Sequence, residues 1–192
     1  GDMYCAGGLN NNSVIRGDVF LAGTAVQGGF VEGSLQQQVV EPPVSWPEVT
    51  RGDLRPTYYI GSQAYSAELV ASYYHPEGVF RPSVGNPGGV RWRDSSLALE
   101  GDIDIEGCLL VGGNLSVRSD GVVLTAAKNL PALIVEGDMV IMDGASIQIN
   151  GLAIVNGDIH ISSYGGVLEV HGALFARRGI GEWVIDKSGN WY

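Results

Sequence analysis

The chain has 192 residues, of which 29 are glycine, and its 11 basic and 21 acidic residues give a formal net charge of −10. The length allows one domain with a substantial core. The basic residues are too scattered to form a phosphate-binding surface, which argues against nucleic acid and anionic membranes as partners. Glycine is about twice as frequent as its usual share of ~7% and lacks the three-residue period of collagen, so it indicates many tight turns.

The first region, residues 1–40, consists of short apolar segments bounded by glycine. Within it, RGDVFL (16–21) places a valine and a leucine two residues apart directly after Gly-Asp. Alternation with a period of two is typical of short strands, so residues 1–40 are expected to form the first coils of a solenoid. The tripeptide Arg-Gly-Asp at 16–18, which animal adhesion receptors read on extended loops, is interpreted as a corner between two such strands.

The second region, residues 41–96, is rich in proline and breaks this pattern. Proline cannot donate the ladder hydrogen bond of a central strand, so the region is expected to be an insertion of loops packed on the solenoid. One stretch, SQAYSAELVASYYH (62–75), has apolar residues at helical spacing between Ser62 and Pro76, and it predicts one short helix. A second Arg-Gly-Asp, at 51–53, is predicted to be a turn.

The aromatic residues of this insertion are a candidate contact surface, since exposed aromatic side chains suit contacts with proteins or glycans. The alternative is that their rings simply cover the flank of the solenoid. The residues concerned are Trp46, Tyr58, Tyr59, Tyr73, Tyr74 and Trp92.

The third region, residues 97–181, contains an internal repeat. Gly-Asp pairs begin at 101, 137 and 157, and each is followed by apolar residues two positions apart. The first gap is 36 residues and the second is 20. We therefore expect the first gap to hold two coils of about 18 residues and the second to hold one.

A second alignment supports the repeat: ASIQINGLAIVNG (145–157) matches GVLEVHGALFARRG (166–179), with Gly151 on Gly172. Units of about 20 residues without a helix indicate a solenoid, in which stacked coils bury a continuous inward row. The strict hexapeptide period of left-handed forms is absent. The expected fold is all-β, a right-handed single-stranded parallel β-helix forming one domain over 1–192, with a proline-rich, partly helical insertion and a tail at 182–192.

No catalytic, cofactor-binding or metal-binding residue is predicted. Asp104 and Glu106 indicate a solvated acidic face. His75 ends the predicted helix, while His160 and His171 take outward positions on strands, and neither a cysteine nor a close carboxylate completes a metal set. The remaining aspartates are expected at corners, namely Asp18, Asp102, Asp138 and Asp158.

The two cysteines, Cys5 and Cys108, are too few for a disulfide framework and lack metal-ligand spacing. Cys108 is interpreted as a small core residue, and a disulfide between the two is the alternative in an oxidising compartment. No Ser-centred elbow, phosphate loop, metalloprotease motif or dinucleotide fingerprint occurs. The sequence therefore predicts a protein without enzymatic activity and without a cofactor.

The segment LPALIVEGDMVIMDGASIQINGLAIVNGDIHISSYGGVLEVHGALFARRG (130–179) resembles the C-terminal β-helical domain of bacterial type IV pilus assembly proteins of the minor-pilin type. The matching motifs are ALIVEGDMVIM, INGLAIVNGD and VHGALFARRG. In addition, GDVFLAG followed by EPPVSWPEV is similar to the family's first coil and proline-rich exit. The resemblance implies a membrane helix N-terminal to this chain and an extracytoplasmic position on the bacterial envelope or cell surface. It supplies no catalytic residue.

The expected function is that of a non-enzymatic, extracytoplasmic structural or interaction module linked to pilus assembly or cell-surface adhesion. Its expected partners are proteins of a pilus or envelope assembly, or surface glycans. Two alternatives stay open. A self-assembling β-helix like the bactofilins would expose its end coils. A β-helical carbohydrate-active enzyme would need a groove lined by three or more acidic groups.

Overall fold

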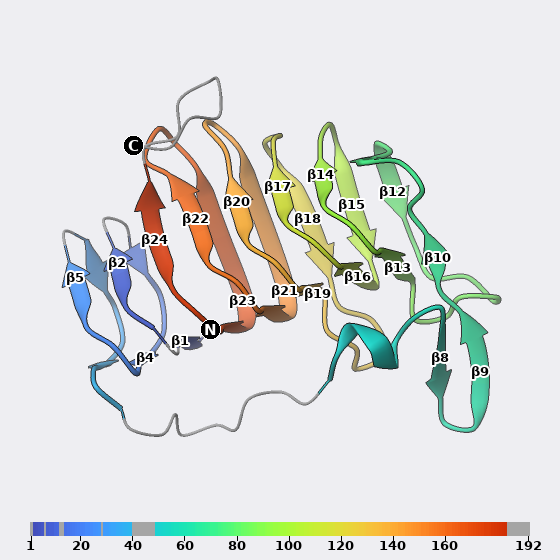
Figure 1. Ribbon diagram of the computed structural model, residues 1–192, viewed down its shortest axis with the longest axis horizontal. Helices are drawn as coiled ribbons and strands as arrows, with labels where there is room; N and C mark the ends of the chain where they lie inside the picture. Colours follow the sequence, from blue (N-terminus) through green and yellow to red (C-terminus); the bar gives the residue numbers. More distant parts are fainter. Residues whose placement is uncertain (1, 6, 12–13, 28, 40–48, 184–192) are drawn as a thin grey trace.

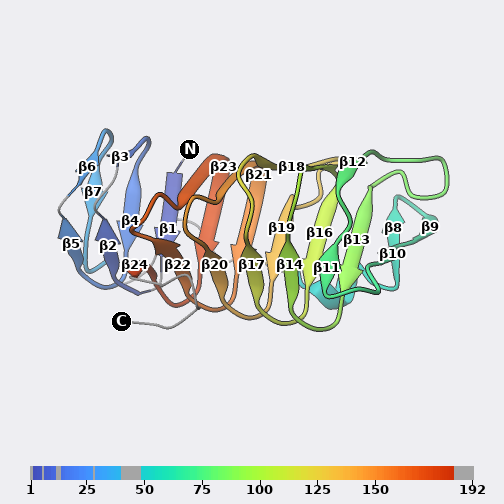
Figure 2. The same ribbon diagram turned by 90° about the horizontal axis from the view of Figure 1, so that it is seen from above.

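The computed structural model describes residues 2–5, 7–11, 14–27, 29–39 and 49–183, and these form an all-β parallel solenoid (Figure 1). Short strands of successive coils lie side by side, and the coils stack along the long axis of the molecule (Figure 2). The parallel β-helix predicted from the repeats is therefore confirmed.

Each complete coil contributes a strand to three faces. Face 1 contains, in stacking order, β10 (Glu68–Leu69), β13 (Val90–Arg93), β16 (Cys108–Val111), β19 (Leu133–Val135), the second halves of β21 (Ser146–Val155) and β23 (Val167–Ala176), β1 (Asp2–Cys5), β4 (Val19–Leu21) and β7 (Leu35–Gln36). Face 2 contains β11 (Tyr74–His75), β14 (Leu97–Leu99), β17 (Leu115–Val117), β20 (Met139–Ile141), β22 (Ile159–Ser162), β24 (Ile180–Trp183), β2 (Leu9–Asn11) and β5 (Ala25–Gln27). Face 3 contains β12 (Gly78–Phe80), β15 (Ile103–Glu106), β18 (Val122–Thr125) and the first halves of β21 and β23. A separate parallel pair is β3 (Val14–Ile15) with β6 (Phe30–Val31), and an antiparallel hairpin joins β8 (Thr57–Ile60) to β9 (Gln63–Ser66).

The core is the lumen that the three faces enclose. Side chains alternate between lumen and exterior along each strand, as the pleat of a strand requires. On face 2, Leu115 pairs with Met139 and Met139 with Ile159, and all three are fully buried. Because one coil cannot enclose its inward residues alone, stacking is what removes this apolar row from water.

Glycines form the corner between faces 3 and 1. Gly151 pairs with Gly172, as the second sequence alignment predicted. Both have positive φ, at 134° and 153°, and a Cβ at Gly172 would lie 2.1 Å from the carbonyl oxygen of Gly151. A side chain at Gly172 is therefore excluded on conformational grounds and by close backbone contact.

The Gly-Asp pairs lie at different corners. Those at Gly137 and Gly157 both turn the chain from face 1 into face 2 and are equivalent, because β20 and β22 pair in register. The pair at Gly101 precedes β15 on face 3, and the pair at Gly17 precedes β4 on face 1. The predicted equivalence of the pairs at 101 and 137 is wrong, because each coil has several corners and Gly-Asp suits more than one of them.

The order of coils in the stack differs from their order in the chain. Strand β1 pairs with β23, placing Asp2 beside Ala173, and β2 pairs with β24, placing Leu9 beside Ile180. Strands β1, β2, β4, β5 and β7 therefore extend the solenoid beyond its C-terminal coils, and Figure 1 shows the N-terminal strands next to β24. At the opposite end, the outermost coil comes from residues 68–80, in the middle of the chain.

The helix predicted over 62–75 is wrong, because β9, β10 and β11 occupy this stretch. Val70 is buried while Leu69 and Tyr73 are exposed, so these residues share no helical face and instead alternate about strands. Pairing of β10 with β13 supplies backbone hydrogen bonds that a local pattern cannot reveal. Within the predicted insertion, the structure thus distinguishes the hairpin of 57–66 from solenoid strands between 68 and 93.

Candidate functional site

Two of the predicted surface aromatics are packed against the solenoid. Tyr58 is fully buried, and its hydroxyl donates to Asn86 Oδ1 at 2.7 Å. Trp92 donates from Nε1 to the Ala67 carbonyl at 3.4 Å, and the Arg55 guanidinium lies 4.9 Å above its ring. Their cluster includes outward residues of face 1, namely Val90, Cys108, Leu110, Ile134 and Ile154. The hairpin segment therefore covers part of the flank of the solenoid.

Tyr59, Tyr73 and Tyr74 are exposed, and they belong to the end of the stack that carries the hairpin (Figure 2). Leu69, Tyr74 and Val79 point outward from faces 1, 2 and 3 of the end coil, so exposed apolar groups surround this end. Trp46, the remaining predicted contact residue, lies outside the described residues. We call the following set the hairpin-end surface: Tyr59, Leu69, Tyr73, Tyr74, Val79 and Val84.

The backbone at this end is open. Strand β10 pairs with β13, β11 with β14 and β12 with β15, and no strand among the described ranges pairs with the outer edge of any of the three. Unpaired edges of this kind can accept a strand from another chain. The hairpin-end surface therefore combines exposed apolar side chains with available backbone hydrogen-bonding groups.

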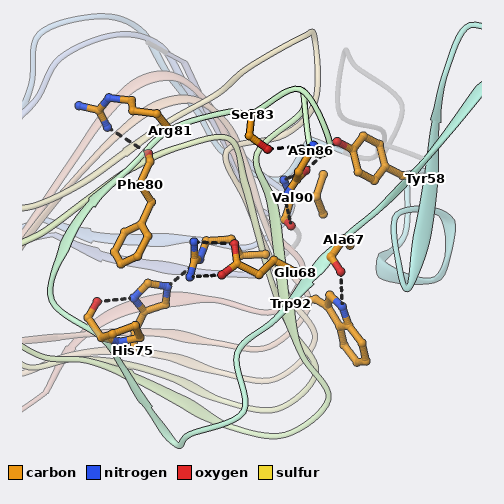
Figure 3. A network of polar contacts seen from close by, with 12 residues as sticks. Tyr58, Ala67, Glu68, His75, Phe80, Arg81, Ser83, Asn86, Val90 and Trp92 are labelled. Carbon is orange, nitrogen blue, oxygen red and sulfur yellow. Dashed lines mark hydrogen bonds and ion pairs between the residues drawn. The ribbon is translucent and has the colours of Figure 1, made fainter.

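Inside the end coil, the lumen becomes polar. Arg91 is in register with the core residue Leu109, yet its guanidinium donates to the Glu68 carboxylate at 2.8 and 2.9 Å (Figure 3). Its Nε donates to His75 Nε2 at 3.2 Å, and its charge lies 4.0 Å above the Phe80 ring. We call Glu68, His75, Phe80 and Arg91 the end plug, because they separate the apolar core from solvent.

His75 is held neutral in the end plug. An arginine Nε can only donate, so Nε2 of His75 accepts and Nδ1 carries the proton that is donated to the Pro76 carbonyl at 2.8 Å. Burial lowers the pKa of His75 to about 4, the bond to Pro76 raises it, and the charge of Arg91 lowers it. Protonation of His75 would place a second cation beside Arg91.

Both charged side chains of the first Arg-Gly-Asp contact other residues of this chain. Asp18 accepts hydrogen bonds from the Ser34 amide at 2.7 Å and the Ser34 hydroxyl at 2.9 Å, and these bonds lower the pKa of Asp18. Arg16 lies 3.5 Å from Glu32 of the adjacent coil. The predicted role of this tripeptide as a corner agrees with these contacts.

The second Arg-Gly-Asp forms the 3-10 turn η1 (Arg51–Asp53). Arg51 donates to Asp94 Oδ1 at 2.7 Å, and its side chain is 19% exposed. Asp53 accepts from the Thr50 amide at 2.8 Å and the Thr50 hydroxyl at 2.6 Å, which lowers the pKa of Asp53. Both ends of the tripeptide are therefore bound to the chain itself.

A ladder of side-chain acceptors follows the corner between faces 1 and 2. The Asn114 amide donates to Ser96 Oγ at 3.0 Å, the Asp138 amide donates to Asn114 Oδ1 at 3.0 Å, and the Asp158 amide donates to Asp138 Oδ1 at 2.9 Å. Gly179 occupies the next corner. Serine, asparagine and aspartate thus perform the same structural role, and only the two aspartates carry charge.

The two charged steps of this ladder lie beside a histidine. One ligand atom each from Asp138, Asp158 and His160 lies within 4.8 Å of the other two. Burial lowers the pKa of His160, whereas the two carboxylates raise it. Asp158 and His160 also line a pocket of about 290 Å³ that opens where Gly179 and Gly181 have no side chains.

The expectation that no close carboxylate accompanies His160 is therefore wrong. The usable signal was the 20-residue spacing of Asp138 and Asp158, which puts equivalent corners one coil apart, with His160 two residues further on. His171 lies elsewhere, on face 3, where its Nε2 is 2.8 Å from Glu169 Oε1. The two histidines do not share a face.

The two carboxylates of the predicted acidic face, Asp104 and Glu106, lie beside an arginine of the neighbouring coil. Asp104 and Glu106 face Arg81, whose Nη1 is 3.0 Å from Asp104 Oδ1 and whose Nε is 3.6 Å from Glu106 Oε2.

Cys5 and Cys108 are free thiols, so the disulfide alternative is wrong. Both are buried, which raises the pKa of each thiol and agrees with the interpretation of Cys108 as a core residue.

Comparisons with known proteins gave no match, whether the chain was scanned against protein-family models, compared with curated proteins or searched against solved structures. Among the described residues, no helix is long and apolar enough to cross a membrane.

Proposed function

We propose that this chain is a non-enzymatic structural and interaction module, in which a rigid solenoid presents its hairpin end to a protein partner. The observation that carries the proposal is the chemistry of that end. Six exposed apolar side chains lie between residues 59 and 84, around three strands with open outer edges. Exposed aromatic groups next to unpaired strand edges favour a protein that adds its own backbone to the sheet.

The interior of the end coil also supports binding of a protein at the hairpin end. Arg91 donates hydrogen bonds to both Glu68 and His75. The polar groups of the end plug therefore have partners inside the coil, while the strand edges stay open. A solenoid that ended in an apolar lumen would need a covering element. Here, the polar end plug can face water before a partner binds. The outward apolar side chains then provide the binding energy.

For the cellular setting, we propose the bacterial envelope or cell surface, with partners in a pilus or envelope assembly and with attachment through a helix N-terminal to this chain. This part rests on the resemblance of 130–179 to minor-pilin-type pilus assembly proteins. Surface glycans are the second partner class that the exposed tyrosines suit.

Site-specific photo-crosslinking tests the interaction. A photoreactive phenylalanine analogue is placed at Tyr74 in the protein expressed in its native bacterium, and Tyr164 is the matched control. Both are exposed tyrosines, at 46% and 63%, but Tyr164 lies between β22 and β23, away from the hairpin end. We expect one protein to be crosslinked at Tyr74 and absent at Tyr164. Equal products at both sites, or none at either, would contradict a role of this end in binding.

Self-assembly is the second candidate, because the open edges of β10, β11 and β12 could equally accept a coil of another copy. In the crosslinking experiment, this candidate predicts a product of twice the chain mass that contains only this protein. The carbohydrate-active alternative has less support, since the pocket next to His160 is lined by one carboxylate, that of Asp158.

A further inference from the structure

We propose that Asp138, Asp158 and His160 form a binding site for one divalent transition-metal ion, for which Zn²⁺ is the reference case. The three side chains come from two adjacent coils and bring two carboxylates and one imidazole together. Their ligand atoms lie within 4.8 Å of one another. This inference is independent of the proposed partner surface, which lies at the hairpin end.

The ligand set fits a transition metal better than calcium or magnesium. Zn²⁺ binds imidazole nitrogen and carboxylate oxygen at about 2.0–2.2 Å, so neighbouring ligand atoms in a tetrahedral site are roughly 3.4 Å apart. Side-chain rotation of Asp138, Asp158 and His160 can close the present separations to that value. Ca²⁺ takes about 6–8 oxygen ligands, whereas an imidazole with two carboxylates suits Zn²⁺ and its neighbours in the first transition series.

The negative charges at this corner exceed what the backbone needs. Ser96 and Asn114 accept the same hydrogen bond from the next coil without carrying charge, as the ladder shows. Two aspartates one coil apart repel each other, and an asparagine at 138 would remove that cost while keeping the bond to the Asp158 amide. A cation between the carboxylates offsets the repulsion.

Arg178 supplies little positive charge to Asp158. Arg178 Nη1 lies 4.0 Å from Asp158 Oδ2, and the arginine side chain is 68% exposed, so this contact is weak. The hydrogen bond between the coils at this corner uses the Asp158 backbone amide and not the Asp158 carboxylate. That carboxylate can therefore turn toward a metal ion without breaking the hydrogen bond between the coils.

Three protein ligands leave one tetrahedral position open. Asp158 and His160 line the pocket of about 290 Å³, and Gly8, Gly179 and Gly181 form part of its wall. Without side chains at these glycines, water or a small anionic ligand can reach the fourth position. The ion would also join two coils, because Asp138 precedes β20 whereas Asp158 and His160 belong to the turn and strand of β22.

Isothermal titration of the full chain with ZnCl₂ tests the site. The protein is purified without a polyhistidine tag, stripped with a chelator and titrated in a buffer that does not bind metal. We expect one Zn²⁺ per chain and a higher unfolding temperature in the presence of the ion, because a ligand that binds only the folded state stabilises it. The substitutions Asp138→Asn and His160→Gln should each weaken binding at least tenfold.

His171→Gln is the matched control. This variant removes an exposed histidine that also has a carboxylate partner, Glu169, but lacks a second carboxylate, and it should leave the affinity unchanged. Circular dichroism of the metal-free variants checks their fold, since Asp138→Asn retains the acceptor that Asn114 provides in the preceding coil. Co²⁺ gives a second readout, and its visible absorption should appear in the wild type and in His171→Gln but not in His160→Gln.

The proposal would be overturned by no saturable Zn²⁺ binding, by binding that survives Asp138→Asn combined with His160→Gln, or by equal affinity for Zn²⁺ and Ca²⁺. The last result would mean that an acidic surface attracts cations without a site. Loss of binding in His171→Gln would place the ion elsewhere and overturn it as well.

Discussion

The middle coils and the end coil enclose the same lumen but fill it with opposite chemistry. In the middle, Leu97, Leu115 and Met139 follow one another in register and are completely buried. At the hairpin end, the corresponding interior holds His75 beside Arg91, whose partner Glu68 reaches solvent. A repeating core has to stop somewhere, and here it stops in a hydrogen-bonded polar cluster instead of a covering helix.

The outward-facing apolar residues of the middle coils and of the end coil differ in their burial. Outward apolar residues of the middle coils, such as Leu110 and Ile134, are buried beneath the segment that carries Tyr58. Outward apolar residues of the end coil, such as Leu69 and Val79, are exposed. The middle of the solenoid therefore buries apolar residues on both sides of its sheets, whereas its end leaves outward apolar residues exposed. The three predictions that follow test this division, from the largest expected effect to the smallest.

Leu115→Ala should destabilise the protein by about 2–5 kcal/mol, because it leaves a cavity in a lumen whose neighbours above and below are fixed by strand pairing. Urea unfolding gives the free energy. The control is Leu69→Ala in the end coil, at 56% exposure, which should change the free energy of unfolding by less than about 0.5 kcal/mol. Similar losses in the two variants would show that the end coil is packed as the middle is.

Acid should weaken the end plug through His75. Its folded pKa of about 4 lies below its unfolded value of 6.5, so between these values the unfolded chain binds the additional proton. Stability should therefore fall as the pH drops from about 6.5 to about 4, by up to about 3 kcal/mol, and this group should contribute no change above that window.

Urea unfolding at pH 7 and pH 5 measures this effect in the wild type and in His75→Gln. Glutamine can still accept from Arg91, but it does not titrate. His160 also has a lowered pKa and contributes to both proteins alike. The loss of unfolding free energy between pH 7 and pH 5 should therefore be larger in the wild type than in His75→Gln, and the difference is the contribution of His75. An identical loss in the variant would assign the pH dependence to other groups.

Glu68→Gln should cost about 1 kcal/mol, because Arg91 loses a charged partner while Glu68 itself is 53% exposed and partly screened. Hydrogen exchange should accelerate in β10, β11 and β12 and stay unchanged in β16 and β17. The control Glu106→Gln removes a contact of 3.6 Å between two half-exposed groups and should have almost no effect. Faster exchange throughout the stack would mean that the plug stabilises the whole solenoid and not only its end.

Much of the fold could be read from the sequence because its signals are local. Alternating apolar residues bounded by glycine predicted strands and coils, and the match of Gly151 with Gly172 gave a correct register. The helix over 62–75 failed because apolar spacing in a short stretch is ambiguous between helix and strand. The pairing partner that resolved it, β13, lies more than twenty residues away.

The candidate sites were harder to predict for the same reason. Tyr58 and Tyr59 are adjacent in the chain, yet one is fully buried and the other is 66% exposed, and only the position of the hairpin separates them. Similarly, Asp138 and His160 come together because two coils are stacked in one register. A single sequence lists such residues without saying which corners are neighbours.

The sequence by itself determined that this chain coils into a parallel β-solenoid, because strand alternation and glycine corners depend on a few consecutive residues. The tertiary structure alone decided the order of the stack, with the N-terminal strands β1 and β2 placed beyond the C-terminal coils. It also decided which charged groups end the lumen and which carboxylates meet His160. Those outcomes depend on hydrogen bonds between coils, which join residues far apart in the chain and leave no local pattern.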